Sequence, residues 1–280
     1  MELHTLVDTV YLLSAVTFVL GLKLMNDPAT ARQGNLVSGI GVVAAVIVTL
    51  MDARVERFEY VAGGLALGAA AGWYAVSRSP LSGLPRLTGL LNGFGGLAGW
   101  LVAWAEFHAH PAGQGLFGGI ALWLTTVLGC LSFAGSLTAW ARTREGNIGG
   151  NPVRYAGQHH VARAVLLAVL LTGVLFALDT VAPAAYRYFA LFSLLSLLMG
   201  VLFVLPASGA GLPATICTLN ACTGFAACAA GFVYQNMLLV AAGALTGAGG
   251  IRLMLVVCKA SGCDFAGVLA GVFRAPAGGR

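Results

Sequence analysis

Long apolar runs separated by short polar stretches dominate this sequence. A membrane-spanning helix needs about 20 mostly apolar residues, and on this rule the sequence predicts nine spans. They lie near residues 5–25, 35–51, 58–77, 86–107, 116–141, 161–179, 185–205, 213–233 and 236–258. The pattern therefore predicts an all-α fold, a polytopic transmembrane helix bundle.

The polar stretches between these runs are too short to fold by themselves. The longest runs from Arg142 to His160, and the tail after Ala260 is of similar length. Even marginal domains need about 40 residues. We therefore predict one transmembrane helical domain over residues 1–260, followed by a short tail over residues 261–280. Neither part is expected to contain a nucleotide-binding domain.

Composition excludes a soluble enzyme and a nucleic-acid-binding protein. Only 9% of the residues are charged, 59% are hydrophobic, and the mean hydropathy is +0.88, whereas soluble domains are about one quarter charged. The formal net charge is +5, but the basic residues are scattered over short loops instead of forming a patch. The 39 glycines lie within apolar runs, where small residues let helices approach closely.

The basic residues also predict an orientation. Eleven Lys and Arg residues fall on the side that holds the C-terminus and three on the other, with Arg252 left inside the ninth span. Because loops on the cytoplasmic side are enriched in Lys and Arg, the C-terminus is predicted to be cytoplasmic. With nine spans, the N-terminus is then outside.

A short internal repeat points to two asparagines. LPRLTGLLNGFGG from Leu84 and LPATICTLNACTG from Leu212 share Leu-Pro, Leu-Asn and a Gly at a constant offset of 128 residues. Asn92 and Asn220 should therefore lie at matching depths in two parallel spans. Such amides belong in a bundle interior or a water-filled cavity. They either line a polar pathway or form interhelical hydrogen bonds, and Ser132 and Ser136 could join either arrangement.

The spans contain no other obvious chemistry. Five of the six cysteines lie in apolar spans without the close Cys/His spacing of a metal site, so no metal is expected. No Asp, Glu or His lies deep in a span. Asp8, Glu106 and Asp179 fall near span ends, and the histidines, His108 and His110 among them, are expected to be solvated.

Five blocks of the sequence carry a family resemblance. They are GLKLMNDPATARQGN (21–35), LPRLTGLLNGFGGLAG (84–99), AGSLTAWARTREG (134–146), LPASGAGLPATICTLNACTGFAACAAGF (205–232) and GALTGAGGIRLMLVVCKA (243–260). These blocks resemble the membrane domain of the β subunit of proton-translocating NAD(P) transhydrogenase, and their order matches the family over nearly the whole chain.

The resemblance implies a proton-channel component of an enzyme that is not catalytic alone. Proton translocation would drive hydride transfer from NADH to NADP⁺. The chain itself would bind no cofactor, since NADP(H) and NAD(H) belong to partner domains. The expected partners are the α subunit, with its NAD(H) domain and further membrane helices, and an NADP(H)-binding domain expected to follow the tail. The resemblance also implies a dimer of protomers in the lipid bilayer of the plasma (inner) membrane.

Some positions depart from the family pattern. Many members carry His where this chain has Asn92 and Asp where it has Gly211, and an amide does not titrate near neutral pH. Arg252 replaces an apolar residue, seven residues before Lys259. Arg252 either snorkels to the cytoplasmic interface or acts as a fixed cation in the cytoplasmic cavity, and we predict that Arg252 and Lys259 take part in coupling at the cytoplasmic face. The alternative function is an uncoupled membrane scaffold, or a transporter of a small solute or ion, on the same fold.

Overall fold

The computed structural model describes residues 2–25, 27, 29–51, 57–80, 83–111, 115–143, 151–178, 182–207, 209 and 211–273. Within these ranges the chain forms nine long α-helices, one short α-helix and a 3-10 turn, with no strand. The predicted all-α class is confirmed. The helices form two compact units, residues 1–79 and residues 80–280, which are described separately.

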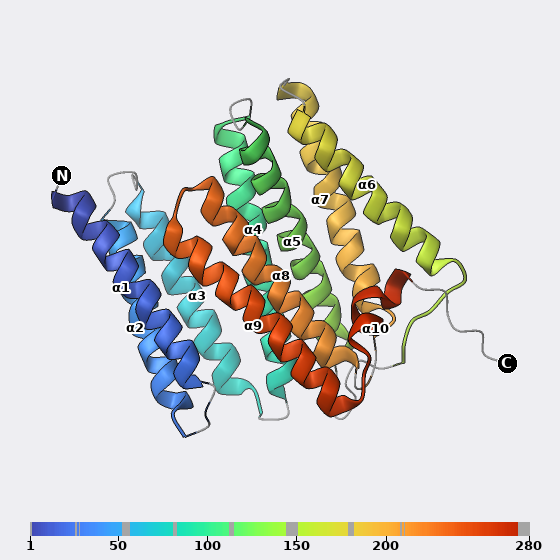
Figure 1. Ribbon diagram of the computed structural model, residues 1–280, viewed down its shortest axis with the longest axis horizontal. Helices are drawn as coiled ribbons and strands as arrows, with labels where there is room; N and C mark the ends of the chain where they lie inside the picture. The colour runs from blue at the N-terminus through green and yellow to red at the C-terminus, as the bar shows by residue number, and fades with distance from the viewer. Residues whose placement is uncertain are drawn as a thin grey trace. The chain divides into compact units, whose positions relative to one another are not determined.

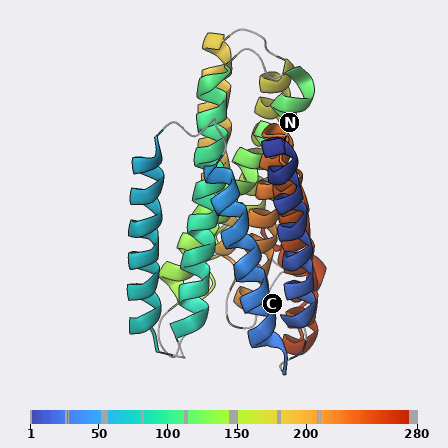
Figure 2. The ribbon, with the colours of Figure 1, turned by 90° about the vertical axis from the view of Figure 1, so that its left-hand side faces the viewer.

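The first unit contains an antiparallel pair, α1 (Glu2–Met25) and α2 (Ala31–Leu50), seen side by side in Figure 2. Glycine lets the two backbones meet. A Cβ added to Gly34 would lie 2.6 Å from the Gly21 carbonyl oxygen. Further along the pair, the Tyr11 hydroxyl lies 2.9 Å from Thr49 Oγ1. This is the packing expected of small residues between membrane helices.

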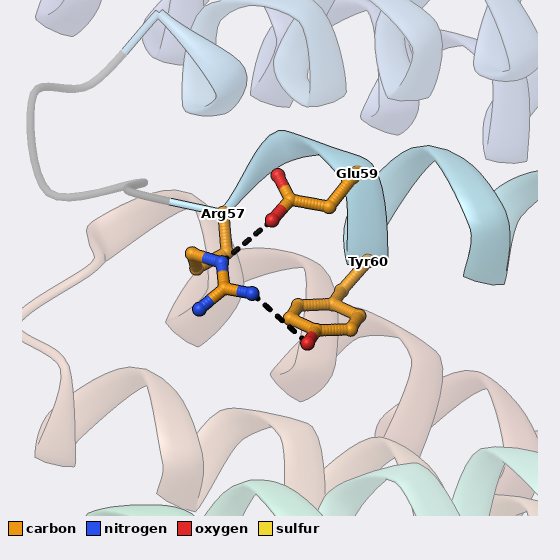
Figure 3. Close-up of polar contacts among 3 residues, drawn as sticks. All are labelled: Arg57, Glu59 and Tyr60. Atoms are coloured by element: carbon orange, nitrogen blue, oxygen red, sulfur yellow. Dashed lines mark hydrogen bonds and ion pairs between the residues drawn. The ribbon is translucent and has the colours of Figure 1, made fainter.

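The third helix, α3 (Phe58–Arg78), has no buried residue. Arg57 precedes it, with Nε donating to Glu59 at 2.6 Å and Nη2 donating to the Tyr60 hydroxyl at 2.9 Å (Figure 3). Eight of the nine long helices in the described ranges are both long and apolar enough to cross a membrane. The exception is α3, because its Gly, Ala, Trp and Tyr residues make it less apolar. The ninth crossing, and the orientation that depends on it, stay predictions.

The second unit contains six long helices, which Figure 1 labels along the chain. Every long helix in the described ranges matches a predicted span to within four residues at each end. The length of an apolar run is therefore a reliable guide to helix bounds in this chain. The six are α4 (Leu84–Ala109), α5 (Gly115–Arg142), α6 (Gln158–Leu178), α7 (Ala182–Val204), α8 (Gly211–Val233) and α9 (Met237–Ser261).

Helix α5 is the hub of the second unit, since it packs against α4, α6, α7 and α8. At one end, aromatic side chains fill the core, and the Phe107 and Phe189 rings stack with centroids 4.8 Å apart. Elsewhere small residues bring backbones together. A Cβ on Gly96 of α4 would lie 2.7 Å from the Gly129 carbonyl oxygen of α5. Helix α9 packs along α8 through glycines in the same way (Figure 1).

Part of the predicted tail is folded. Asp264 accepts hydrogen bonds from the amides of Ala266 and Gly267 and thereby caps α10 (Phe265–Ala270), and the 3-10 turn η2 (Gly271–Phe273) buries Val272 against α6. The sequence analysis missed these two elements because they are too short to give a periodic signal. The predicted loop and tail charges Arg54, Arg144, Arg274 and Arg280, and the acid Asp179, lie outside the described residues.

Candidate functional site

Helices α4 and α8 run parallel and in the register of the sequence repeat. A Cβ on Gly95 would lie 3.0 Å from Thr223, which is 128 positions further on, and one on Gly99 would lie 3.7 Å from Ala226. Pro85 and Pro213 both fall in the first turn of their helices, where a missing N–H costs nothing. Because the contact at Gly95 and Thr223 preserves the offset, Asn92 and Asn220 lie at the same depth.

The two asparagines nevertheless have different surroundings. The half-buried side chain of Asn92 on α4 donates from Nδ2 to Ser132 Oγ at 3.1 Å and to Ser136 Oγ at 2.8 Å, both on α5. Ser132 in turn lies 2.9 Å from the Leu219 carbonyl oxygen of α8 and makes a short contact with the Thr223 hydroxyl. Asn92, Ser132, Ser136 and Thr223 form one hydrogen-bonded group, which we call the amide–hydroxyl network.

Asn220 does not join this network. It is half-buried on α8, and within the described part of the chain its side chain makes no hydrogen bond. Leu219, the residue before it, faces α5, whereas Ala221, the residue after it, faces Gly250 of α9. With about 100° between successive residues, Asn220 lies between these two directions, close to Thr223 on the surface of α8 but without a hydrogen bond to the network. The sequence repeat thus places Asn92 and Asn220 at equal depth but does not give them common hydrogen-bond partners.

At the end where α8 begins, Gly211 lines a cavity of about 250 Å³ together with Arg154, Thr215 and Asp264. A Cβ built on Gly211 meets nothing within 4 Å. The position that would carry an acid by the family resemblance is therefore open, and an Asp there would have room. The cavity faces the side predicted to be cytoplasmic.

The two predicted coupling residues lie on the outer face of α9. Gly250 and Met254 are buried on the side facing α8, whereas Arg252, between them, is exposed. Lys259 is also exposed, seven residues after Arg252, so the two cations share one stripe of the helix. Neither makes an ion pair or hydrogen bond within the described residues. This stripe is separate from the amide–hydroxyl network, which is built from α4, α5 and α8.

Thr223 belongs to the network but was not predicted from the sequence. The signal was present, because Thr223 follows Asn220 by three residues and so lies near it on the helix surface, but threonine commonly bonds back to its own helix. Thr223 does both, since it also lies 3.2 Å from the Leu219 carbonyl oxygen. Only the packing of α8 on α5 reveals the second partner.

The chemistry of this network is that of hydrogen-bond exchange. Amide and hydroxyl groups can orient water and pass hydrogen bonds along a chain, but they do not hold a proton near neutral pH. Among the described residues, no three His, Cys, Asp or Glu side chains are grouped so that they could hold a metal ion. The buried hydroxyls of Thr126 and Ser196 make no hydrogen bond within the described ranges, and each could bind a water molecule.

Comparison with known proteins gives one family. Residues 7–280 match the family described as NAD(P) transhydrogenase beta subunit. The chain is 32% identical over 282 aligned positions to the NAD(P) transhydrogenase subunit beta of Rhodospirillum rubrum, and it matches the same protein from a named strain of that species equally well. The match covers 98% of this chain but 60% of the relative, so the chain spans about three fifths of the relatives' length.

Proposed function

Because the chain belongs to the NAD(P) transhydrogenase beta subunit family, we propose that it is the membrane-spanning proton-channel part of a transhydrogenase. Proton movement through its helices would be coupled to hydride transfer from NADH to NADP⁺. The observation that carries the proposal is the amide–hydroxyl network, which joins three apolar helices at their interior. Polar side chains at that depth are costly in lipid unless they face a bundle interior or a water-filled cavity, and a proton pathway would run through such a cavity.

The proposal assigns chemistry to partners. Hydride transfer would take place on an NADP(H)-binding domain and on the NAD(H) domain of an α subunit, and this chain would bind neither nucleotide. The α subunit would also add membrane helices, and the assembly would be a dimer of protomers in the plasma membrane. Arg252 and Lys259, which share the exposed stripe of α9, are positioned for contact with such partners or with lipid headgroups.

The mechanism follows from what the network can and cannot do. Binding of NADP(H) on the cytoplasmic side would change the packing of α4, α5 and α8 and so the access of water to Asn92. The two packings would open the network to opposite sides in turn, which is coupling through a two-state element. The protein supplies ordered hydrogen bonds, whereas water and nearby titratable groups carry the proton.

A second function is favoured by one observation. The network holds no titratable side chain, and Gly211 leaves its cavity without an acid at that position. An uncoupled membrane scaffold, or a transporter of a small solute or ion, would need neither. This alternative predicts that partner chains assemble with the protein but that no proton moves when hydride is transferred.

The deciding experiment uses membranes that hold this chain with partner chains bearing the NAD(H) and NADP(H) domains. Hydride transfer and acidification of the vesicle interior are followed together for the native protein, Asn92→Leu and Asn220→Leu. Thr88→Val is the matched control, because Thr88 is an exposed residue one turn before Asn92 whose hydroxyl bonds only within α4.

Proton uptake that Asn92→Leu abolishes and Thr88→Val retains would support the proposal. Loss in Asn220→Leu alone would move the pathway off the amide–hydroxyl network. Hydride transfer without proton movement in the native assembly would mean an uncoupled relative. If the intact assembly shows neither hydride transfer nor proton movement, the scaffold or transporter function would be favoured.

A further inference from the structure

A group of titratable side chains lies at the other end of α4 from Leu84. Glu106 Oε1 lies 3.0 Å from His110 Nδ1 one turn further on, and the Glu106 side chain is only 18% exposed while that of His110 is 64% exposed. Tyr234, the residue after α8, donates from its hydroxyl to the Val102 carbonyl oxygen at 3.2 Å, and it lies beside the Glu106 carboxylate. A half-buried acid is thus joined to an imidazole that reaches solvent.

This group continues the seam that holds the amide–hydroxyl network. Asn92, Gly99 and Glu106 are spaced seven residues apart and so share one face of α4. That face packs on α8, since Gly95 meets Thr223 and Gly99 meets Ala226. Tyr234 lies just beyond the end of α8, on the same side of the seam. The rise of 1.5 Å per residue puts Glu106 roughly 21 Å along the axis from Asn92.

The other titratable groups at this end are turned elsewhere. His108 Nδ1 lies 3.0 Å from the Tyr186 hydroxyl of α7, and its ring stacks on Trp104, on the opposite side of α4. Arg187 of α7 is exposed. Within the described residues, the titratable partners that face Glu106 are therefore His110 on α4 and Tyr234 after α8. Burial and the Glu106 charge raise the pKa of Tyr234 to about 12, so its hydroxyl keeps its proton at neutral pH.

We propose that Glu106, with His110 and Tyr234, is the proton-binding site at the mouth of the α4–α8 seam on the side away from the start of α4. The amide–hydroxyl network cannot hold a proton, and this group supplies the missing titratable chemistry on the same helix face. His110 exchanges protons with bulk water, Glu106 binds one in its half-buried position, and Tyr234, held by its hydrogen bond to the Val102 carbonyl oxygen, lies beside the carboxyl group. The inference rests on the proposed function, because it assumes that protons move along this seam.

The test uses the assembled enzyme in vesicles whose internal and external pH are set independently. Coupled hydride transfer is measured while pH is varied only on the side that Glu106 faces, for the native protein, Glu106→Gln, Glu106→Asp and Tyr234→Phe. His108→Gln is the matched control, since His108 lies at the same depth on the opposite face of α4. A carboxyl signal in infrared difference spectra after a pH jump provides a readout that does not depend on transport.

We expect Glu106→Gln to lower the coupled rate on the order of tenfold or more, to flatten its dependence on that pH, and to remove one carboxyl band. Glu106→Asp should restore part of the rate, Tyr234→Phe should displace the pH profile, and His108→Gln should change nothing. A native pH profile and an intact carboxyl band in Glu106→Gln would overturn the inference and leave the proposed function standing. Absence of proton movement in the native assembly would overturn both.

Discussion

The close contact between Gly96 and Gly129 holds Asn92 within hydrogen-bonding distance of Ser132. Gly96→Ala should push the two helices apart and break this hydrogen bond. The added Cβ would lie 2.7 Å from the Gly129 carbonyl oxygen, 2.8 Å from the Phe133 nitrogen and 3.0 Å from Ser132 Cβ. Two of these atoms are backbone and cannot rotate away. Ordinary van der Waals contact begins at 3.4 Å, so α4 and α5 must separate by roughly 0.7 Å if helix backbones stay rigid.

The magnitude of this effect has two parts. Overpacking a close interface costs about 1–3 kcal/mol. A separation of that size would lengthen the Asn92–Ser132 bond from 3.1 Å past hydrogen-bonding distance, and an interhelical hydrogen bond in a membrane is worth about 0.6–2 kcal/mol. We therefore expect a total loss of about 2–5 kcal/mol in the free energy of unfolding.

The matched control is Gly99→Ala, one turn further along α4. Its Cβ would meet only Ala226 Cβ, at 3.7 Å, which is an ordinary contact. Both substitutions gain the same helix propensity, up to about 1 kcal/mol, so the difference between the two variants isolates the steric cost at Gly96. Unfolding by titration of a denaturing detergent into mixed micelles, followed by tryptophan fluorescence, measures this difference.

The same pair also tests the proposed pathway. In the assembled enzyme, Gly96→Ala should reduce proton movement while Gly99→Ala retains it, because only the first displaces the amide–hydroxyl network. The reasoning is refuted if the two variants unfold within about 0.5 kcal/mol of one another, the range of substitutions that disturb nothing. Rigid-backbone packing would then be the wrong description of this interface.

Three further substitutions test other parts of the fold. Gly250→Ala should destabilise the protein by about 1–3 kcal/mol, because its Cβ would lie 2.8 Å from a backbone nitrogen of α8. The neighbouring Gly249→Ala is the control, since its Cβ meets nothing within 4 Å, and it should not change the free energy of unfolding in the same detergent titration. Arg142→Met should lower the thermal unfolding temperature. The Arg142 guanidinium donates to four backbone carbonyls at 2.7–3.1 Å, three of them at the end of α7. A loss of less than about 1 kcal/mol in the free energy of unfolding would show that these hydrogen bonds do not stabilise the end of α7. Gly211→Asp should fold normally, because the cavity beside residue 211 is open. Its free energy of unfolding should rise by about 0.3–1 kcal/mol from the interaction of the carboxylate with the helix dipole. A clear loss of stability in thermal denaturation would show that the space is not accessible to a carboxylate.

The predicted helices agree with the structure because the thickness of the hydrocarbon layer fixes how long an apolar run must be. The run at 116–141 became α5, Gly115–Arg142, and the other spans agree to within four residues at each end. Local chemistry was equally readable. Pro85 marks the start of α4, and the constant offset of the repeat places Asn92 and Asn220 at one depth.

What the sequence could not supply is the rotation of each helix about its own axis. In these helices nearly every face is apolar, so the hydrophobic pattern that orients an amphipathic helix in a soluble protein is weak. Sequence spacing therefore treated Asn92 and Asn220 alike, whereas packing brings Asn92 into hydrogen bonds with Ser132 and Ser136 and leaves Asn220 without a hydrogen bond among the described residues.

The same limit explains the two features found only in the tertiary structure. Thr223 joins the network, and Glu106 is half-buried beside Tyr234, because close approach at glycines brings α4, α5 and α8 together. The sequence by itself determined which segments form long apolar helices, how long they are and at what depth their polar residues lie. Only the tertiary structure decided which of those residues meet, because contacts between apolar helices depend on backbone approach and side-chain shape that hydropathy does not encode.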